Sequence, residues 1–167
     1  MSRAFVRESD FPESDEPPRR QAALPPGVTN YITAAGAERL GRELSELRAS
    51  RAPAPADGDS EARRTAQQLD RRIAELEASL RTMQVVTAPP LDRETVRFGA
   101  TVTVRDAAGA ELVFRIVGVD EVETDRNWIS WLSPAARALL NARVGQKVSF
   151  ARPGGRTEWE IRGVTYE

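Results

Sequence analysis

The chain has 167 residues, a formal net charge of −1, no cysteine and no histidine. Its length suits one ordinary domain or two small ones, and its balanced charge gives no bulk electrostatic reason to coat nucleic acid or to bind a membrane surface. The missing residue types exclude disulfides, thiolate nucleophiles, histidine-based triads and zinc sites of the usual ligand set. No apolar run approaches the about 20 residues of a membrane span, and the first residues lack the apolar core of a signal peptide, so we expect a cytoplasmic protein.

Residues 1–30 are rich in proline, serine and charged residues, as in ESDFPESDEPPRR and LPPGVTN. Such a segment buries too little apolar surface to offset the entropy that is lost on ordering, so we predict a disordered tail. Phe5 and Val6, in RAFVRE, form a candidate docking motif, although a solvated tail is the favoured interpretation.

Residues 31–87 carry apolar residues at the alternating three- and four-residue spacing of a coiled coil. The first stripe consists of Ala37, Leu40, Leu44 and Leu47, and the second of Ala62, Ala66, Leu69, Ile73, Leu76, Leu80 and Met83. Both stripes are narrow, which predicts helices with exposed outer faces. Between them, APAPADGDSE (residues 52–61) contains two prolines that end a helix. The short connection predicts an antiparallel coiled-coil hairpin, with Thr33 as N-cap and helices over about 33–52 and 60–86.

Residues 95–167 change to a β-rich pattern. The runs TVRFGATVTV, AELVFRIVGV, NWISWL, QKVSFA and TEWEIRGVTY are separated by turns such as DAAGA and RPGGR. One helix interrupts them, with Ser133 as N-cap, Pro134 in the first turn and an end near Gly145. A five-stranded antiparallel sheet packed on this helix gives an α+β fold class, joined to the hairpin by a linker at residues 88–94.

The sequence offers no convincing pair of a nucleophile and a base, so we expect no catalytic residues, no intrinsic metal and no intrinsic cofactor. Lys147, the one lysine, lies at the start of a predicted strand, and no helix follows RPGGR to bind a phosphate. Binding surfaces remain as candidates. Strand alternation places Trp131 and Leu132 on opposite faces, of which one belongs to the core and the other is a candidate partner surface. The acidic loop that begins with Asp120 and Glu121 has a solvated loop as its favoured interpretation.

Several strings resemble the bacterial Gre transcription elongation factors, namely YITAAGAERLGRELSELR, VRFGATVTV, FRIVGVDEVE, ISWLSPAARALLNARVGQKVSF and EWEI. The resemblance covers about residues 30–167, is most specific in the C-terminal part, and is closer to the GreB branch at the ending EWEIRGVTYE. It implies an FKBP-like C-terminal domain, without isomerase activity, that grips the rim of the secondary channel of RNA polymerase. It also implies that the hairpin enters this channel, where acidic residues at its tip help to hold a metal ion while the polymerase hydrolyses its own backtracked transcript.

The resemblance also implies candidate site residues. Asp57, Asp59 and Glu61 would share Mg²⁺ with the polymerase active site, although a plain acidic turn explains them equally well. The residues that would bind the polymerase are Asp120, Glu121, Trp131, Leu132, Ser133 and Pro134. The residues that would contact transcript RNA are Arg48, Arg51, Arg63 and Arg64, for which a solubilising role is slightly favoured.

The tip departs from the family pattern in two ways. Family tips usually read GD.SEN.EY, whereas this chain has GDSEARRT, with Asp59 and Glu61 two residues apart instead of three. The first arm allows about 18 helical residues, roughly 27 Å at about 1.5 Å per residue, and both arms are shorter than family arms by roughly 10 Å. A carboxylate that far from a metal ion cannot be its ligand, because Mg²⁺ holds its oxygen ligands at about 2.1 Å.

Three functional interpretations remain. A shortened Gre-like factor would bind RNA polymerase at its secondary channel as a monomer and modulate paused or backtracked complexes without cleavage. A full cleavage stimulator would hold Mg²⁺ with its tip carboxylates, and the polymerase would still perform the reaction. A general protein-binding module would instead dimerise through the hairpin. In the first two interpretations, transcript RNA or DNA is contacted only within the elongation complex.

Overall fold

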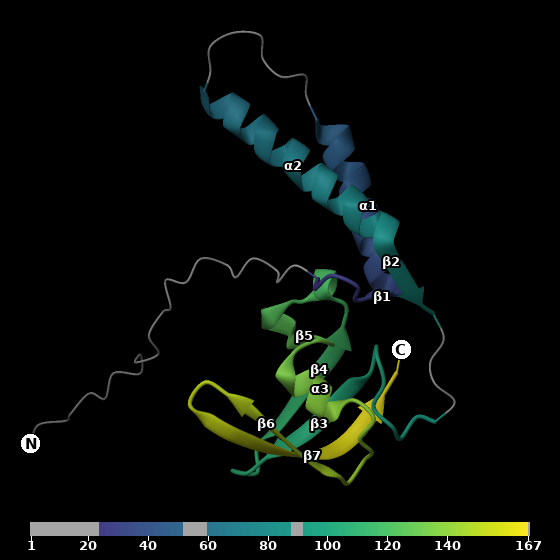
Figure 1. The fold of residues 1–167 in the computed structure, drawn as a ribbon, viewed down its shortest axis with the longest axis vertical. Coiled ribbons are helices and arrows are strands. Elements are labelled where there is room, and N and C mark those ends of the chain that lie inside the picture. The colour runs from purple at the N-terminus through teal and green to yellow at the C-terminus, as the bar shows by residue number, and fades with distance from the viewer. Residues whose placement is uncertain (1–23, 52–59, 88–91, 167) are drawn as a thin grey trace, which may run out of the picture.

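The computed structural model describes residues 24–51, 60–87 and 92–166. A helical hairpin rises from one end of a β domain, and its base lies against that domain (Figure 1). Helix α1 (Ala34–Ser50) has 17 residues and helix α2 (Ser60–Thr82) has 23. At about 1.5 Å per residue these arms are about 25 Å and about 34 Å long. Among the described helices, none is long and apolar enough to cross a membrane.

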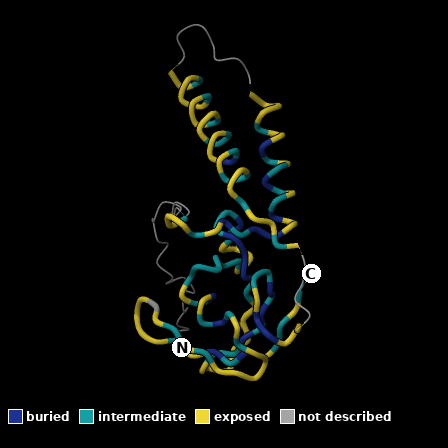
Figure 2. The backbone as a smooth tube through the Cα atoms, turned by 45° about the vertical axis from the view of Figure 1, so that its right-hand side comes forward, coloured by how far each residue is buried: buried dark blue, intermediate teal, exposed yellow. Residues whose placement is uncertain are grey.

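The two helices pack through the predicted apolar stripes near the base of the hairpin. This seam consists of the buried residues Ile32, Leu40, Leu44 and Leu76 and the partly buried residues Ala37, Leu47, Ile73, Leu80 and Met83. The arms separate toward their free ends (Figure 2). Ala62, Ala66 and Leu69, the first residues of the second stripe, are therefore half-buried and lie outside the seam.

Strand β1 (Asn30–Thr33) and strand β2 (Met83–Val86) form a parallel pair at the base of the hairpin. Parallel strands need a long crossover connection, and the two helices supply it. Two sequence-based boundaries are corrected here. The second helix ends at Thr82 instead of near residue 86, because the next four residues pair with β1. The predicted tail reached residue 30, but Asn30 is a buried strand residue.

The C-terminal part contains a five-stranded sheet with the order β5-β4-β3-β7-β6. Its strands are β3 (Thr101–Asp106), β4 (Glu111–Val117), β5 (Trp128–Ser130), β6 (Lys147–Arg152) and β7 (Gly155–Thr165). The α+β class is confirmed, but the sheet is mixed instead of fully antiparallel, since β4 and β5 are parallel. The chain crosses between these two strands through the short 3-10 helices η1 (Val119–Glu121) and η2 (Thr124–Arg126).

Helix α3 (Pro134–Leu139) packs Ala136 and Leu139 into the core of the β domain. Its predicted cap is confirmed, because the hydroxyl of Ser133 accepts a hydrogen bond from the backbone N–H of Ala136 at 3.1 Å. The helix is shorter than the sequence predicts and does not reach Gly145. Asn141 has a φ of 69°, in the left-handed region, which is incompatible with continued helix.

Candidate functional site

The free end of the hairpin carries one described member of the predicted acidic tip. Glu61 lies exposed in the first turn of α2, where a negative charge suits the positive end of the helix dipole. Asp57 and Asp59 lie outside the described residues. Within residues 24–51, 60–87 and 92–166, no group of three or more acidic side chains is placed to hold a metal ion.

The four arginines of the predicted RNA-contacting patch fall into two kinds. Arg63 and Arg64 are exposed near the start of α2, close to the free end of the hairpin. The other two form ion pairs between the helices, Arg48 with Glu77 at 2.6 Å and Arg51 with Asp70 at 2.7 Å. Exposed pairs of this kind contribute at most about 1 kcal/mol each, so both arginines could exchange their carboxylate for a phosphate at little cost.

A buried carboxylate lies where the hairpin meets the β domain. The residue Glu121 is 1% exposed. Its Oε2 accepts hydrogen bonds from the backbone N–H of Thr33 at 2.9 Å and from that of Gly118 at 3.0 Å. Its Oε1 accepts a further bond from the hydroxyl of Thr33. This finding corrects the expectation that Glu121 contacts the polymerase, because the carboxylate is enclosed between the two parts of the chain.

Two glycines provide the space that this carboxylate and the adjoining backbone occupy. A Cβ atom at Gly36, in the first turn of α1, would lie 2.0 Å from Oε1 of Glu121. A Cβ atom at Gly118 would lie 2.3 Å from the carbonyl oxygen of Tyr31. Both distances are far below van der Waals contact, so a larger residue at position 36 would displace the Glu121 carboxylate and one at position 118 would displace the backbone of the hairpin base.

A second group of contacts at the junction surrounds the ring of Trp128. The guanidinium groups of Arg39, Arg115 and Arg126 lie 5.5, 5.1 and 5.3 Å from the ring centroid. Glu123 forms ion pairs with Arg39 at 2.6 Å and with Arg126 at 2.8 Å. Arg39 belongs to α1 and the other four residues to the β domain, so this cluster attaches the hairpin a second time. It is partly exposed, which makes it weaker and more sensitive to salt than a buried contact.

Two of the predicted polymerase-binding residues also contact the base of the hairpin. Asp120 is half-buried and accepts a hydrogen bond from the side-chain N–H of Asn30 at 3.2 Å. The ring of Trp131 meets the ring of Tyr31 edge-on, with centroids 5.4 Å apart. Both residues therefore have structural partners within the chain.

The remaining three predicted residues surround the start of α3. Ser133 caps this helix through its hydroxyl, Leu132 is half-buried, and Pro134 is exposed. Of the six residues predicted to bind the polymerase, Pro134 presents the most accessible surface, with Leu132 and Asp120 accessible in part.

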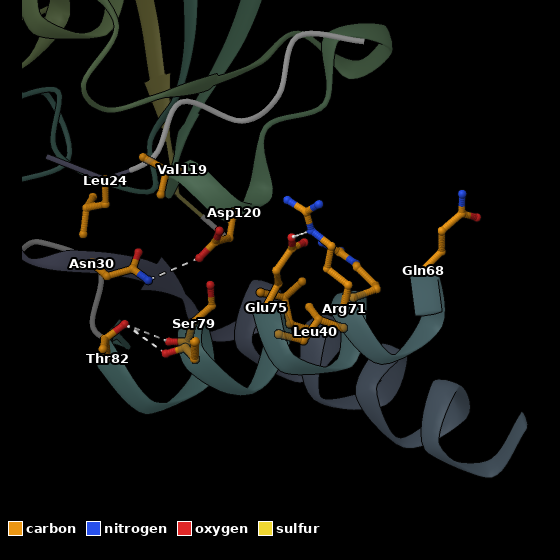
Figure 3. Close-up of a pocket in the computed structure, with 13 residues that line it drawn as sticks. Leu24, Asn30, Leu40, Gln68, Arg71, Glu75, Ser79, Thr82, Val119 and Asp120 are labelled. Atoms are coloured by element: carbon orange, nitrogen blue, oxygen red, sulfur yellow. Dashed lines mark hydrogen bonds and ion pairs between the residues drawn. The ribbon is translucent and has the colours of Figure 1, made fainter. Parts of the chain in front are cut away.

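An open groove of about 850 Å³ lies beside the junction, between α2 and η1 (Figure 3). Leu76 and Val119 contribute apolar surface to it, and Asp120 lies at its edge toward the β domain. Arg71 and Glu75, also in its wall, form an ion pair at 3.0 Å. The charges in the groove balance one another, so nothing in its lining selects an anionic or a cationic ligand.

Sequence reasoning missed the residues of the hairpin base that meet the β domain. Thr33 was identified only as a helix cap, and Gly36 and Arg39 carried no prediction. One signal was present, since a glycine in the first turn of a helix is unfavourable unless close packing requires it. No pattern in the neighbouring sequence indicates that Glu121 packs against Gly36.

Comparisons with known proteins match the chain to transcription factors. A family model described as the C-terminal domain of transcription elongation factor GreA/GreB matches residues 91–166. Transcription elongation factor GreB of Neisseria meningitidis serogroup A is 40% identical over 154 residues, covering 82% of this chain and 94% of that protein. Transcription elongation factor GreA of Ralstonia nicotianae is 34% identical over 152 residues, covering 81% and 96%. The solved GreA/GreB structure from Nitrosomonas europaea has 28% identity, covers 81% of this chain and 98% of its own, and gives a TM-score of 0.42.

Proposed function

Because this chain belongs to the GreA/GreB family of transcription elongation factors, we propose that it binds RNA polymerase, places its hairpin in the secondary channel and modulates paused or backtracked complexes. The family resemblance that the sequence strings indicated is confirmed, including the greater similarity to GreB than to GreA. The chain would act in the cytoplasm and meet transcript RNA or DNA only within the elongation complex.

The observation that carries this proposal is the hairpin itself. Among the described residues, the hairpin lies against the β domain near its base, so most of the described length of its helices is available to enter a narrow channel (Figure 1). Each helix is about 10–12 Å across with its side chains, which keeps the rod thin. The apolar seam is satisfied within one chain by Leu40, Leu44 and Leu76, which supports a monomer and removes the need for a dimerisation arm.

We further propose that the hairpin is shortened and does not support strong transcript cleavage. The described arms have 17 and 23 residues. The alignment with the Neisseria GreB spans 154 positions, but 82% of the 167 residues of this chain cannot occupy all of them. The relative therefore has residues at some aligned positions where this chain has none. A hairpin shorter by two helical turns would end roughly 10 Å earlier, beyond the reach of a metal ligand.

In this proposal the factor contributes no catalytic group and no resident metal. Any Mg²⁺ would belong to the polymerase, and any hydrolysis of the transcript would be the polymerase's own reaction. The tip carboxylates Asp57, Asp59 and Glu61 would at most add oxygen ligands to that ion, which is the chemistry that Mg²⁺ prefers.

A transcription assay on stalled and backtracked complexes tests the proposal. Core RNA polymerase is titrated with the full chain, and binding, transcript cleavage and the rate of resumed elongation are measured separately. We expect binding that a full-length GreB displaces, a change in elongation, and little cleavage. Failure to bind core polymerase, or binding that GreB does not displace, would contradict a shared secondary-channel site.

A further inference from the structure

We propose that Glu121 is a positioning residue that fixes the direction in which the hairpin leaves the β domain. This inference rests on the proposed function, because the direction of the hairpin matters only if the hairpin must enter a channel while the β domain is bound elsewhere. It assigns Glu121 a role inside the protein in place of a contact with the polymerase.

The hydrogen bonds of Glu121 join the two parts of the chain. Oε2 accepts from Gly118 of the β domain at 3.0 Å and from Thr33 of the hairpin base at 2.9 Å, so one oxygen bridges both. A buried carboxylate is costly unless hydrogen bonds satisfy it, and bonds to a charged acceptor are among the strongest. The carboxylate is therefore satisfied only when the hairpin base lies in its observed position.

The hydroxyl of Thr33 connects this carboxylate to the helix itself. It donates to Oε1 of Glu121 and accepts from the backbone N–H of Gly36 at 3.0 Å, as the N-cap of α1. Cap geometry fixes the first turn of a helix. The position of the Glu121 carboxylate thereby determines the orientation of the first turn of α1, and with it the axis of the arm.

Packing at the junction leaves little freedom for another orientation. Gly36 and Gly118 both allow approaches that a Cβ atom would prevent, at 2.0 Å from Oε1 of Glu121 and 2.3 Å from the carbonyl oxygen of Tyr31. The Arg39–Glu123 ion pair adds a contact at the side of α1, but its side chains are 34% and 38% exposed. The buried hydrogen bonds set the direction, and the exposed pair supports it.

The length of the arm amplifies any error at its base. A tilt of about 10° at the base of a rod about 25 Å long moves its far end by about 4 Å. A factor with short arms has little reach to spare, so a defined direction is especially valuable to it.

The absence of cysteine from the chain allows a direct measurement of the hairpin direction. Gln67→Cys on α2 and Ala108→Cys in the turn between β3 and β4 both replace exposed residues and accept a pair of spin labels. Pulsed electron paramagnetic resonance then reports the distance distribution between hairpin and β domain in the isolated protein. We expect one narrow distribution for the otherwise unchanged chain.

Two substitutions in α1 distinguish an effect on the junction from an effect on helix stability. Gly36→Ala introduces a Cβ atom against Glu121, whereas Gly41→Ala introduces one where nothing lies within 4 Å. Alanine favours helix at both positions. We expect Gly36→Ala to broaden or shift the distance distribution and Gly41→Ala to leave it unchanged, with helical content retained in both.

Substitutions of Glu121 complete the test. Glu121→Ala removes both acceptor oxygens and should broaden the distribution, while Glu121→Gln keeps one oxygen for the two backbone donors, loses the acceptor of the Thr33 hydroxyl, and should broaden it less. If Glu121→Ala fails to fold, Gly36→Ala still decides the question. In the polymerase assay, Gly36→Ala should retain binding of the core enzyme and lose the effect on elongation by about tenfold or more.

The outcomes distinguish this inference from the proposed function. Unchanged narrow distances in both Gly36→Ala and Glu121→Ala would overturn the positioning role, whatever the chain does to polymerase. Broadened distances with an undiminished effect on elongation would also overturn it, since direction would then not matter. A parent chain that never binds polymerase would refute the proposed function, and the distances would still decide whether Glu121 sets the direction of the hairpin.

Discussion

The indole ring of Trp131 lies edge-on against the phenol ring of Tyr31, with 5.4 Å between the ring centroids. Tyr31 belongs to β1 at the base of the hairpin, and Trp131 follows β5 in the β domain. The aromatic contact therefore connects the two parts of the chain. The ring of Trp131 is therefore expected to stabilise the fold, even if part of its surface also contacts a partner.

Trp131→Ala is expected to destabilise the chain by about 2 kcal/mol, because a half-buried aromatic contact is lost. Trp131→Phe should cost much less. The indole N–H is buried without a hydrogen-bond partner among the described residues, so its removal carries little penalty. Urea denaturation of both variants measures the difference. Unchanged stability of Trp131→Ala together with lost polymerase binding would identify the ring as a binding residue instead.

The accessible residues among those predicted to bind the polymerase, Asp120 in η1 and Pro134 in α3, yield a second prediction. Asp120→Ala combined with Pro134→Ala should weaken binding of core polymerase by about tenfold if this surface docks, as expected for two contacts of about 0.7 kcal/mol each. Asn30→Ala is the matched control, because it removes the hydrogen-bond partner of Asp120 and leaves its carboxylate in place. Equal binding by the double variant and the parent would show that the polymerase contacts another surface.

Local patterns in the sequence were sufficient to predict the hairpin and the β domain. The heptad spacing of Leu40 and Leu44 identified a helix with one buried face, and Ser133 followed by Pro134 identified the start of α3. These features depend on residues within one or two turns of each other. Periodicity also misled at one point, since Met83 continues the heptad stripe and yet begins strand β2.

The junction could not be predicted from local patterns. Thr33 and Glu121 are 88 residues apart, and neither residue alone indicates that it is buried against the other. The parallel pairing of β1 with β2 and of β4 with β5 likewise depends on how the chain crosses over, which short motifs do not specify. Single-sequence reasoning therefore assigned Glu121 to the surface, where most glutamates lie.

Arg63 and Arg64 provide the test of the RNA-contacting patch. If this patch meets RNA phosphates, replacing both with Ala should weaken binding to a backtracked complex and make that binding less dependent on salt, because two positive charges are lost. Arg42→Ala with Arg81→Ala is the matched control, since it removes the same charge from exposed sites of the same hairpin. An identical loss of binding in both double variants would indicate a general charge effect and no local contact.

Tyr166 predicts a pH dependence of stability. Its hydroxyl donates to the carbonyl oxygen of Thr95 at 2.6 Å and accepts from the backbone N–H of Arg97 at 2.8 Å. Burial raises the pKa of the Tyr166 phenol above its usual value, so the folded state holds the proton more tightly than the unfolded state. The resulting stability is fully present below the unfolded pKa of about 10 and is lost as the pH rises through the higher folded value.

Tyr166→Phe should therefore cost about 1 kcal/mol at neutral pH, from the lost hydrogen bonds, and should reduce the decline in stability above about pH 10. Denaturant unfolding at neutral pH and at several alkaline values measures both effects. An equally steep alkaline decline in the variant would assign that decline to other groups.

The acidic tip gives the last prediction. Replacing Asp57, Asp59 and Glu61 with Ala should change polymerase binding little, and the parent should stimulate little cleavage at fixed Mg²⁺, if the arms end short of the polymerase metal as we propose. Lengthening both arms tests the cause directly. Inserting one heptad into each arm adds roughly 10 Å and keeps the seam in register. If reach is the limit, the extended chain should stimulate cleavage, and the triple Ala change should abolish this gain.

Two other outcomes would contradict this explanation. Strong cleavage by the unextended parent that the triple change removes would show that the tip reaches the metal already. An extended chain that remains inactive would show that the GDSEARRT tip, with Asp59 and Glu61 two residues apart, lacks the required geometry.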